Sequence, residues 1–347
     1  MSILGERLKM ARAMSGLSLR QVAERAGVSH TAVSKYERGL NVPSSPVLLR
    51  LAEALDVTLD YLLRPTTIVL EPEMVHYRCR SRSGVKARNR VQGEVSECVE
   101  RYLDVERLFE APMPFSLPEI DLSVSHLDDI EGLVLALRDA WELGYDPIEN
   151  LMAVFEDRGI RVCLVEGCEG LDGLCAWVRD ESGDRIPVIA VQRDVPGDRQ
   201  RFNLAHELAH LLLKLAPEVD EEAAAHRFAG AFLAPAPAVR AELGERRNDV
   251  EPRELYLLKH KYGLSMQAWA RRARDLGIIG ESSYKRICMR FSQLGWRKRE
   301  PGEQVSPEEP QRMQQLIFRA LAEDMISRSR AKELLGEDIE EMEPVLA

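Results

Sequence analysis

The sequence is poor in cysteine and contains no long apolar run, and both shortages exclude classes of protein. Its 347 residues include six cysteines and no Cys-x-x-Cys pair, which is too few for a disulfide scaffold or a zinc ribbon in a chain of this length. No run of about 18 apolar residues is present to cross a membrane. The first residues read as a charged helix with Glu6, Arg7 and Lys9 rather than as a secretory signal. We therefore expect a protein of the reducing cytoplasm, with no membrane partner.

The sequence also lacks a Gly-rich phosphate loop, a Ser/His/Asp signature and a dinucleotide fingerprint. Its composition, with 45% hydrophobic and 30% charged residues, is that of a globular protein rather than a disordered or fibrous one. At roughly 150 residues per domain, the length predicts two or three domains.

The net charge of −10 is unevenly distributed along the chain. Residues 1–90 carry fifteen Lys and Arg against eight Asp and Glu, so the rest of the chain is strongly acidic. This distribution predicts that a polyanion such as DNA binds to the basic N-terminal part of the chain alone. The alternative is a basic face that is merely solvated.

The N-terminal part of the chain consists of short helical stretches separated by turn signals. Ser18 is placed to cap one helix that Gly27 ends, and Ser29 is placed to cap the next, which Gly39 ends. About three residues join these two stretches, as a helix-turn-helix requires. The pattern predicts an all-α DNA-binding domain over residues 1–65.

These stretches closely resemble the Cro/C1-type repressor (XRE) family over nearly all of residues 4–64. The similar segments are SLRQVA at 18–23, GVS at 27–29, VSKYERG at 33–39 and LA at 51–52. The resemblance implies that the third helix enters the major groove of double-stranded operator DNA. The third helix and its end thereby place His30, Thr31, Ser34, Lys35 and Arg38 at bases or groove edges. Gln21, near the start of the preceding helix, would meet a phosphate or a base edge. For each of them ordinary solvent exposure is the alternative.

One such module offers few DNA contacts. Strong binding therefore implies a homodimer on a two-fold site. The pattern does not indicate which surface would join the two copies.

Residues 66–118 read as a connector. It contains a basic stretch over residues 78–90, which either extends the DNA footprint or forms a solvated strand pair or linker. Helical spacing of apolar residues follows over 94–109, and a Pro-rich linker follows over 111–118. A second domain is therefore expected to start near residue 119.

In this second domain, helical stretches precede three short β-rich runs. The runs cover residues 160–165, 171–178 and 186–191, and each is bounded by turn residues. Because the strands follow one another without helices between them, an α+β fold is favoured over an α/β fold.

After the strands, Asp198 is expected to cap a helix that carries His206-Glu207-x-x-His210. Two histidines four residues apart project from one helix face, close enough to share a tetrahedral Zn²⁺. Glu207 is placed to take a proton from zinc-bound water, whose pKa falls to about 7, and to hand it to the leaving amine. The motif predicts a zinc metallopeptidase, and the alternative is a pair of core histidines satisfied by hydrogen bonds.

Two histidines do not hold a catalytic zinc, so a third ligand is needed. A short break forces the next helix, starting near Asp220, to double back on the first. Residue 222 then falls opposite His210, so the spacing favours Glu222 as the third ligand. Glu221 and His226 are the alternatives.

This part of the chain resembles the ImmA/IrrE family of bacterial metallopeptidases over about residues 130–240. The similar segments are LRxxWxLGxxPIxNL at 137–151, LAHELAHLL at 204–212 and ExxxHRFAGAFLxP at 222–235. The resemblance implies a zincin-like fold, with Zn²⁺ on His206, His210 and Glu222 and with Glu207 as the general base. It also implies repressor-like proteins as substrates.

One segment departs from the pattern of many family members, which carry Glu-Ala-Asn where this chain has Ala224-Ala225-His226. His226 lies one helical turn after Glu222. We therefore expect it to orient that carboxylate or to polarise a substrate carbonyl, with a three-histidine zinc site as the alternative.

Residues 241–347 read as helical, with an acidic Pro-rich linker over 301–310 and a helical pair over 311–335 that is a candidate for partner binding or self-association. The expected architecture is α+β and multidomain. Its parts are a helix-turn-helix domain (1–65), a connector (66–118), a zincin-like metallopeptidase domain (119–240) and a helical C-terminal region (241–347).

The favoured interpretation is a DNA-binding transcriptional regulator with a zinc-dependent endopeptidase domain. It would cleave a partner repressor or antitoxin-like protein in a stress, phage or mobile-element response. The alternatives are a non-catalytic transcription factor with a structural or sensing zinc fold, and a protease that cleaves its own chain. Glu207 weighs against the non-catalytic reading, because a zinc held only for structure needs no base beside it.

Overall fold

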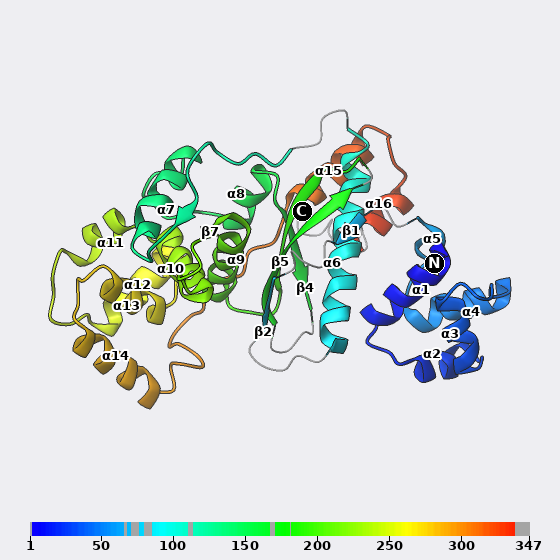
Figure 1. The fold of residues 1–347 in the computed structure, drawn as a ribbon, viewed down its shortest axis with the longest axis horizontal. Coiled ribbons are helices and arrows are strands. Elements are labelled where there is room, and N and C mark those ends of the chain that lie inside the picture. The colour runs from blue at the N-terminus through cyan, green and yellow to red at the C-terminus, as the bar shows by residue number, and fades with distance from the viewer. Residues whose placement is uncertain are drawn as a thin grey trace, which may run out of the picture.

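The computed structural model describes residues 2–65, 68–70, 76–79, 85–109, 114–166, 171–180 and 182–336. An N-terminal helical lobe, a central sheet and a second helical lobe follow one another along the long axis (Figure 1). None of the helices in these ranges is both long and apolar enough to pass through a membrane. The helices are α1 (Ile3–Met14), α2 (Leu19–Ala26), α3 (His30–Glu37), α4 (Ser45–Leu55), α5 (Leu59–Leu63), α6 (Val85–Glu106), α7 (Asp129–Ala140), α8 (Leu151–Asp157), α9 (Gly197–Leu212), α10 (Glu221–Leu233), α11 (Ala236–Leu243), α12 (Pro252–Tyr262), α13 (Met266–Asp275), α14 (Glu281–Gln293), α15 (Arg312–Ala322) and α16 (Arg328–Leu335).

The N-terminal lobe is the expected helix-turn-helix domain. The turn between α2 and α3 contains Gly27 at φ 64°, a left-handed conformation that favours glycine. Ser18 and Ser29 cap the two helices, and each accepts a hydrogen bond from a backbone N–H three residues ahead. Val22 and Val33 are buried in one core with residues of α1, α4 and α5. The predicted all-α fold of this domain is confirmed.

The central sheet has five strands and confirms the α+β fold. Its long middle strand β5 (Leu171–Asp180) pairs antiparallel with β6 (Arg185–Gln192) on one side and with β1 (Ile68–Leu70) and β2 (His76–Cys79) on the other. The edge strand β4 (Arg161–Val165) runs parallel to β6. A separate parallel pair joins β3 (Ser123–Val124) to β7 (Lys214–Leu215).

The two faces of the sheet carry different helices because successive side chains in a strand alternate. Leu174, Ala176 and Val178 pack with Val95 and Val99 of α6. On the opposite face, Cys175, Ile189 and Val191 belong to the larger core that includes α8, α9 and α10. The sheet therefore lies between α6 and the helices that carry the predicted metal ligands (Figure 1).

Part of the expected connector is built into this layered arrangement. Strands β1 and β2 pair with β5, and α6 begins at Val85 rather than near residue 94. The described part of residues 66–118 therefore packs against the second domain and is not an extended linker. Most of the basic stretch over 78–90 lies outside the residues or side chains that the structure describes. The domain division itself stays a prediction.

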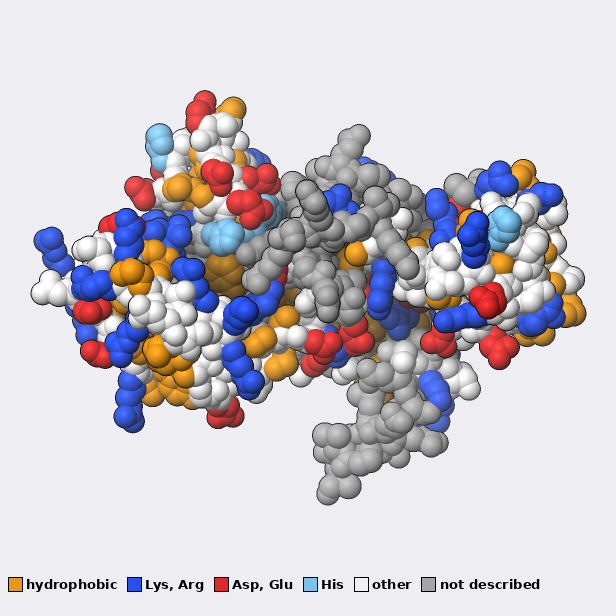
Figure 2. Space-filling model, turned by 90° about the horizontal axis from the view of Figure 1, so that it is seen from below, with side chains coloured by type: hydrophobic (Ala, Val, Ile, Leu, Met, Phe, Trp, Pro, Cys, Tyr) orange, Lys and Arg blue, Asp and Glu red, His pale blue; other side chains and the backbone are white. Residues whose placement is uncertain are grey.

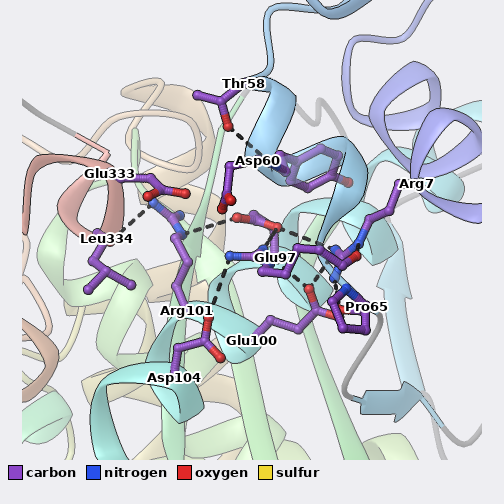
Figure 3. A network of polar contacts seen from close by, with 12 residues as sticks. Arg7, Thr58, Asp60, Pro65, Glu97, Glu100, Arg101, Asp104, Glu333 and Leu334 are labelled. Carbon is purple, nitrogen blue, oxygen red and sulfur yellow. Dashed lines mark hydrogen bonds and ion pairs between the residues drawn. The ribbon is translucent and has the colours of Figure 1, made fainter. Parts of the chain in front are cut away.

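The N-terminal lobe docks on α6 through a network of ion pairs (Figure 3). Arg7 is fully buried, and its Nη1 lies 2.6 Å from Glu100 Oε2. The same guanidinium donates hydrogen bonds to the backbone oxygens of Arg64 and Pro65 at 3.0 and 2.6 Å. The Arg64 side chain reaches Glu97 Oε2 at 2.8 Å. Two arginines of the N-terminal lobe are thus held by acids on one face of α6.

The C-terminal segment returns across the central part of the molecule. The linker expected over 301–310 packs against α9, where Gly197 N donates to Val305 O at 2.8 Å. Glu308 accepts hydrogen bonds from Leu151 N and Met152 N at 2.8 and 2.9 Å, which satisfies the start of α8. Helices α15 and α16 then form the expected helical pair and pack on the end of α6.

Candidate metal centre and DNA-contact surface

Helix α9 brings three residues of the predicted site together inside the protein. His206 and Glu207 are fully buried, and the His210 side chain is 5% exposed. Helix α10 doubles back on α9 as the short break between them predicts. It starts near Asp220 as expected, and Asp220 caps it: its Oδ1 accepts a hydrogen bond from Ala223 N at 2.7 Å.

The atoms that suit a metal ion lie around one point. His206 Nε2 and His210 Nε2 are 3.1 Å apart, and the Glu222 carboxylate oxygens lie 3.6 Å from each of them. A tetrahedral zinc with bonds of about 2.0–2.1 Å separates its ligand atoms by roughly 3.3 Å. The spacing of these three side chains therefore fits a zinc ion.

Glu221 contacts the other nitrogen of the His210 ring. His210 Nδ1 lies 2.9 Å from Glu221 Oε1. A carboxylate that accepts from Nδ1–H fixes the ring so that Nε2 is the nitrogen presented to a metal. From the sequence, Glu221 was expected only as an alternative ligand, and its orienting role was missed. The two consecutive acids at the start of α10 were the signal for it.

His226 lies beside the candidate ligand atoms and is not part of their cluster. Its Nδ1 is 2.6 Å from the backbone oxygen of Glu222, and its ring centroid is 4.8 Å from that of His206. The cluster of ligand atoms within 4.8 Å of one another consists of His206, His210 and Glu222. The His226 side chain, 43% exposed, therefore lies at the solvent-facing edge of this centre.

Glu207 packs closely against strand β5. A Cβ atom on Gly173 would lie 2.6 Å from Glu207 Oε1, so the carboxylate occupies space that any other residue at 173 would fill. The strand is tied to α9 by Asn203 Nδ2, which donates to Asp172 O at 2.8 Å, and by an ion pair between Arg199 and the Asp172 carboxylate. These contacts fix the position of Glu207 relative to the sheet.

Helix α10 is anchored by Glu131 of α7. Arg227 Nε lies 2.6 Å from Glu131 Oε1, and Arg272 binds the same carboxylate with both terminal nitrogens at 2.6 and 3.0 Å. Burial alone would raise the pKa of Glu131, but the hydrogen bonds and charges of the two arginines hold it below its usual value. The ionised anchor therefore holds the helix that carries Glu222.

The start of α9 differs from the sequence-based expectation. The helix begins at Gly197, and its N-cap is Pro196 rather than Asp198. The Asp198 carboxylate instead lies 3.2 Å from Nζ of the fully buried Lys259, which is also 3.0 Å from Glu300. A buried cation needs such partners, and this tertiary contact overrides the local capping preference of Asp198.

A pocket of about 350 Å³ opens beside the candidate metal centre. His210 and Glu221 form its polar side, and Leu213, Leu215 and Val219 supply apolar surface. Histidine and acidic side chains gather on the face of the molecule seen in Figure 2. The pocket therefore borders the side of the His210 ring whose Nδ1 contacts Glu221.

Most of the predicted DNA-contact residues lie on the surface of the N-terminal lobe. The exposed ones are Gln21, His30, Thr31, Lys35 and Arg38, and Ser34 is half-buried. Gln21 Oε1 accepts a hydrogen bond from Ser18 N at 2.9 Å and completes the capping box of α2. Arg38 Nε donates to Ser34 O at 3.1 Å. These two side chains therefore also serve the local structure.

Two protein families match separate parts of the chain. Residues 8–62 match the family model described as helix-turn-helix. Residues 155–274 match the model described as IrrE N-terminal-like domain. The first match covers the helices with the DNA-contact candidates, and the second covers α9, α10 and the candidate metal centre.

Curated relatives are similar to short stretches of the chain. An uncharacterized HTH-type transcriptional regulator of Rickettsia prowazekii is 36% identical over 75 residues, which are 22% of this chain and 58% of the relative. One of Mycobacterium tuberculosis is 43% identical over 58 residues, 17% of this chain and 41% of the relative. The HTH-type transcriptional regulator ImmR of Bacillus subtilis is 38% identical over 60 residues, 17% of this chain and 47% of the relative. The matches thus span about half the length of these relatives.

Proposed function

The chain joins an XRE-type helix-turn-helix domain to an IrrE/ImmA-like peptidase domain, and we propose that it is a transcriptional regulator that also cleaves a partner regulator protein as a zinc endopeptidase. The observation that carries the proposal is the convergence of His206, His210 and Glu222 around one point, with Glu207 buried on the same helix. Similarity to a family indicates the fold, whereas the grouping of these side chains is what supports a catalytic function.

We infer that the ion is Zn²⁺, held by the two Nε2 atoms and the Glu222 carboxylate. Two imidazoles and one carboxylate form a donor set typical of catalytic zinc, and their separations suit its bond lengths. When bound, zinc polarises a peptide carbonyl and lowers the pKa of water at its open position.

The residues of the chain have distinct roles in this proposal. Glu207 holds a proton at its carboxylate between its removal from water and its delivery to the leaving amine. Gly173 leaves the room that this carboxylate needs. Exposed His226 polarises the substrate carbonyl or the developing oxyanion at the edge of the site. The pocket with Leu213, Leu215 and Val219 binds an apolar substrate side chain.

The substrate we propose is a repressor or antitoxin-like protein. The helix-turn-helix domain in the same chain supports it, because this domain brings the peptidase to operator DNA where such proteins bind. We also propose that two copies bind a two-fold operator, since one module makes few contacts.

Cleavage is tested by incubating the zinc-loaded protein with the purified regulator encoded beside its own gene. We expect a small number of discrete fragments, located by mass spectrometry, and no cleavage when a chelator removes the metal. An intact regulator together with an intact peptidase chain would support a non-catalytic zinc module instead. Fragments of the peptidase chain alone would support self-cleavage.

The assignment of the third ligand gives a separate prediction. Glu222→Ala is expected to weaken zinc binding more than Glu221→Ala, which removes only the partner of His210 Nδ1 and should cost about 10–100-fold in affinity. Zinc content and competitive titration measure both effects. Exposed Glu218 supplies the control, and Glu218→Ala should bind zinc as the wild type does. If Glu221→Ala loses more zinc affinity than Glu222→Ala, then Glu221 is the third ligand and Glu222 the supporting residue.

The DNA-contact surface gives another prediction. The double variant Lys35→Ala/Arg38→Ala is expected to weaken binding to the promoter DNA of its own gene by about 1–3 kcal/mol for each lost base contact. The slope of log K against log salt concentration should become shallower by about one for each lost phosphate contact. Titrations at several salt concentrations measure both quantities. Lys285→Ala with Arg286→Ala removes the same charge from exposed positions on α14 and should change neither. If the Lys35→Ala/Arg38→Ala variant binds DNA as the wild type does, the placement of α3 in the major groove is wrong.

A further inference from the structure

Two thiols meet on the face of the sheet opposite the metal centre. Cys98 lies in α6, and Cys163 lies in the edge strand β4. Both belong to the hydrophobic contact between this helix and the sheet, where Cys163 is fully buried and Cys98 packs against the same cluster. The two thiols are close enough for a hydrogen bond between them to shift the pKa of each. The pair joins two elements that are distant in sequence.

The surroundings favour the thiolate form of one member of the pair. The hydrogen bond from Cys163 and the positive charge of Arg101 lower the pKa of the Cys98 thiol. The same hydrogen bond and burial raise the pKa of Cys163. Cys98 is thus the more acidic thiol of the pair and the better candidate for a nucleophile.

The nucleophilic member is also the accessible one. Cys98 is half-buried and lines a pocket of about 410 Å³ between α6, β4 and the C-terminal segment. Arg101 and Tyr102 of the same helix and Met313 from the C-terminal segment line this pocket as well. A small neutral oxidant can therefore reach Cys98, with Cys163 directly behind it as the resolving thiol.

We propose that Cys98 and Cys163 are a redox-modified pair that closes to a reversible disulfide on reaction with a peroxide. The Cys98 thiolate attacks one peroxide oxygen, breaks the O–O bond and becomes a sulfenic acid while water leaves after protonation. The Cys163 sulfur then displaces the hydroxyl from the Cys98 sulfur, and its proton leaves with that hydroxyl as a second water. Two thiols are oxidised by two electrons in total, and one hydrogen peroxide is reduced to two waters.

The bond would close next to the docking network of the DNA-binding lobe. Glu97 precedes Cys98 directly in α6 and binds Arg64 at 2.8 Å. Arg101, one turn later, contacts Glu97 at 3.7 Å and donates to Leu334 O of α16 at 3.4 Å. A covalent link from this turn to β4 therefore ties the base of the docking network to the sheet of the peptidase domain.

The test uses the full-length protein, treated with hydrogen peroxide, alkylated and digested under denaturing conditions. We expect a peptide pair joined through Cys98 and Cys163 with the loss of two hydrogen atoms, and its disappearance after reduction with dithiothreitol. Without peroxide, iodoacetamide at neutral pH should modify Cys98 about tenfold faster than Cys288, the half-buried thiol on α14. Cys288→Ser should leave the Cys98–Cys163 link unchanged.

Single variants separate the two thiols. Cys98→Ser should prevent the link and leave Cys163 reduced, whereas Cys163→Ala should let Cys98 proceed to sulfinic acid for lack of a resolving partner. If Cys163→Ala, a buried substitution in β4, unfolds the protein, the result for Cys98→Ser still tests the proposal. A Cys98 that remains a thiol in peroxide-treated wild-type protein, or that pairs with another cysteine, would overturn the proposal.

Discussion

Glu207→Gln is expected to bind zinc as the wild type does and to lower the proposed peptidase activity by a factor of roughly 10²–10⁴. The amide has the size of the carboxylate, so it fits the space beside Gly173, but it cannot accept the proton that the reaction must move. The metal is retained because the ligand atoms around the centre come from His206, His210 and Glu222. The measurement is the rate of fragment formation at equal zinc content.

The control for this variant is a nearby acid that the proposal gives no role. Glu218 is exposed before the start of α10, and Glu218→Gln should cleave at the wild-type rate. Equal thermal unfolding midpoints for the three proteins would show that only the chemistry has changed. If Glu207→Gln cleaves as fast as the wild type, the proposed proton carrier is wrong even though the metal site stands.

The helices that carry the site could be predicted from the sequence because their signals are local. The His-Glu-x-x-His spacing fixes which side chains share a face of α9, and Asp220 marks the start of the returning helix. The spacing favoured Glu222 as the third ligand but could not exclude Glu221 and His226. The choice among the three depends on the angle and depth at which α10 crosses α9, and these follow from anchors such as Glu131, far away in sequence.

The docking of the N-terminal lobe was not predictable from local patterns. Arg7 and Glu100 look like ordinary surface charges in a sequence, and only the tertiary fold makes both of them buried. The helical spacing predicted part of α6 but gave no sign that one side of it faces the sheet and another faces α1. Charged residues that become buried as pairs carry no apolar periodicity, which is the main signal used to find a core.

Arg7→Met is expected to destabilise the attachment of the N-terminal lobe by up to about 3–5 kcal/mol, because it removes the nearer of the two guanidinium groups that contact the buried Glu100 carboxylate. Glu100 is 1% exposed and lies 2.6 Å from Arg7 Nη1, and Arg64 Nη2, at 3.4 Å, is a more distant neighbour. The substitution also leaves the backbone oxygens of Arg64 and Pro65 without donors. Hydrogen exchange of the α1 and α6 amides measures the loss for this contact alone, whereas a global unfolding curve would mix the domains.

The double variant Arg7→Met/Glu100→Leu separates a lost ion pair from lost packing. Because this variant also removes the buried Glu100 carboxylate, it should recover a substantial part of the stability lost in Arg7→Met. Arg319→Met is the matched control, since Arg319 is 61% exposed in its pair with Glu323 and such a surface pair contributes about 0–1 kcal/mol. Equal exchange rates in Arg7→Met and Arg319→Met would mean that packing around Tyr61, rather than the buried charges on α6, holds the lobe in place.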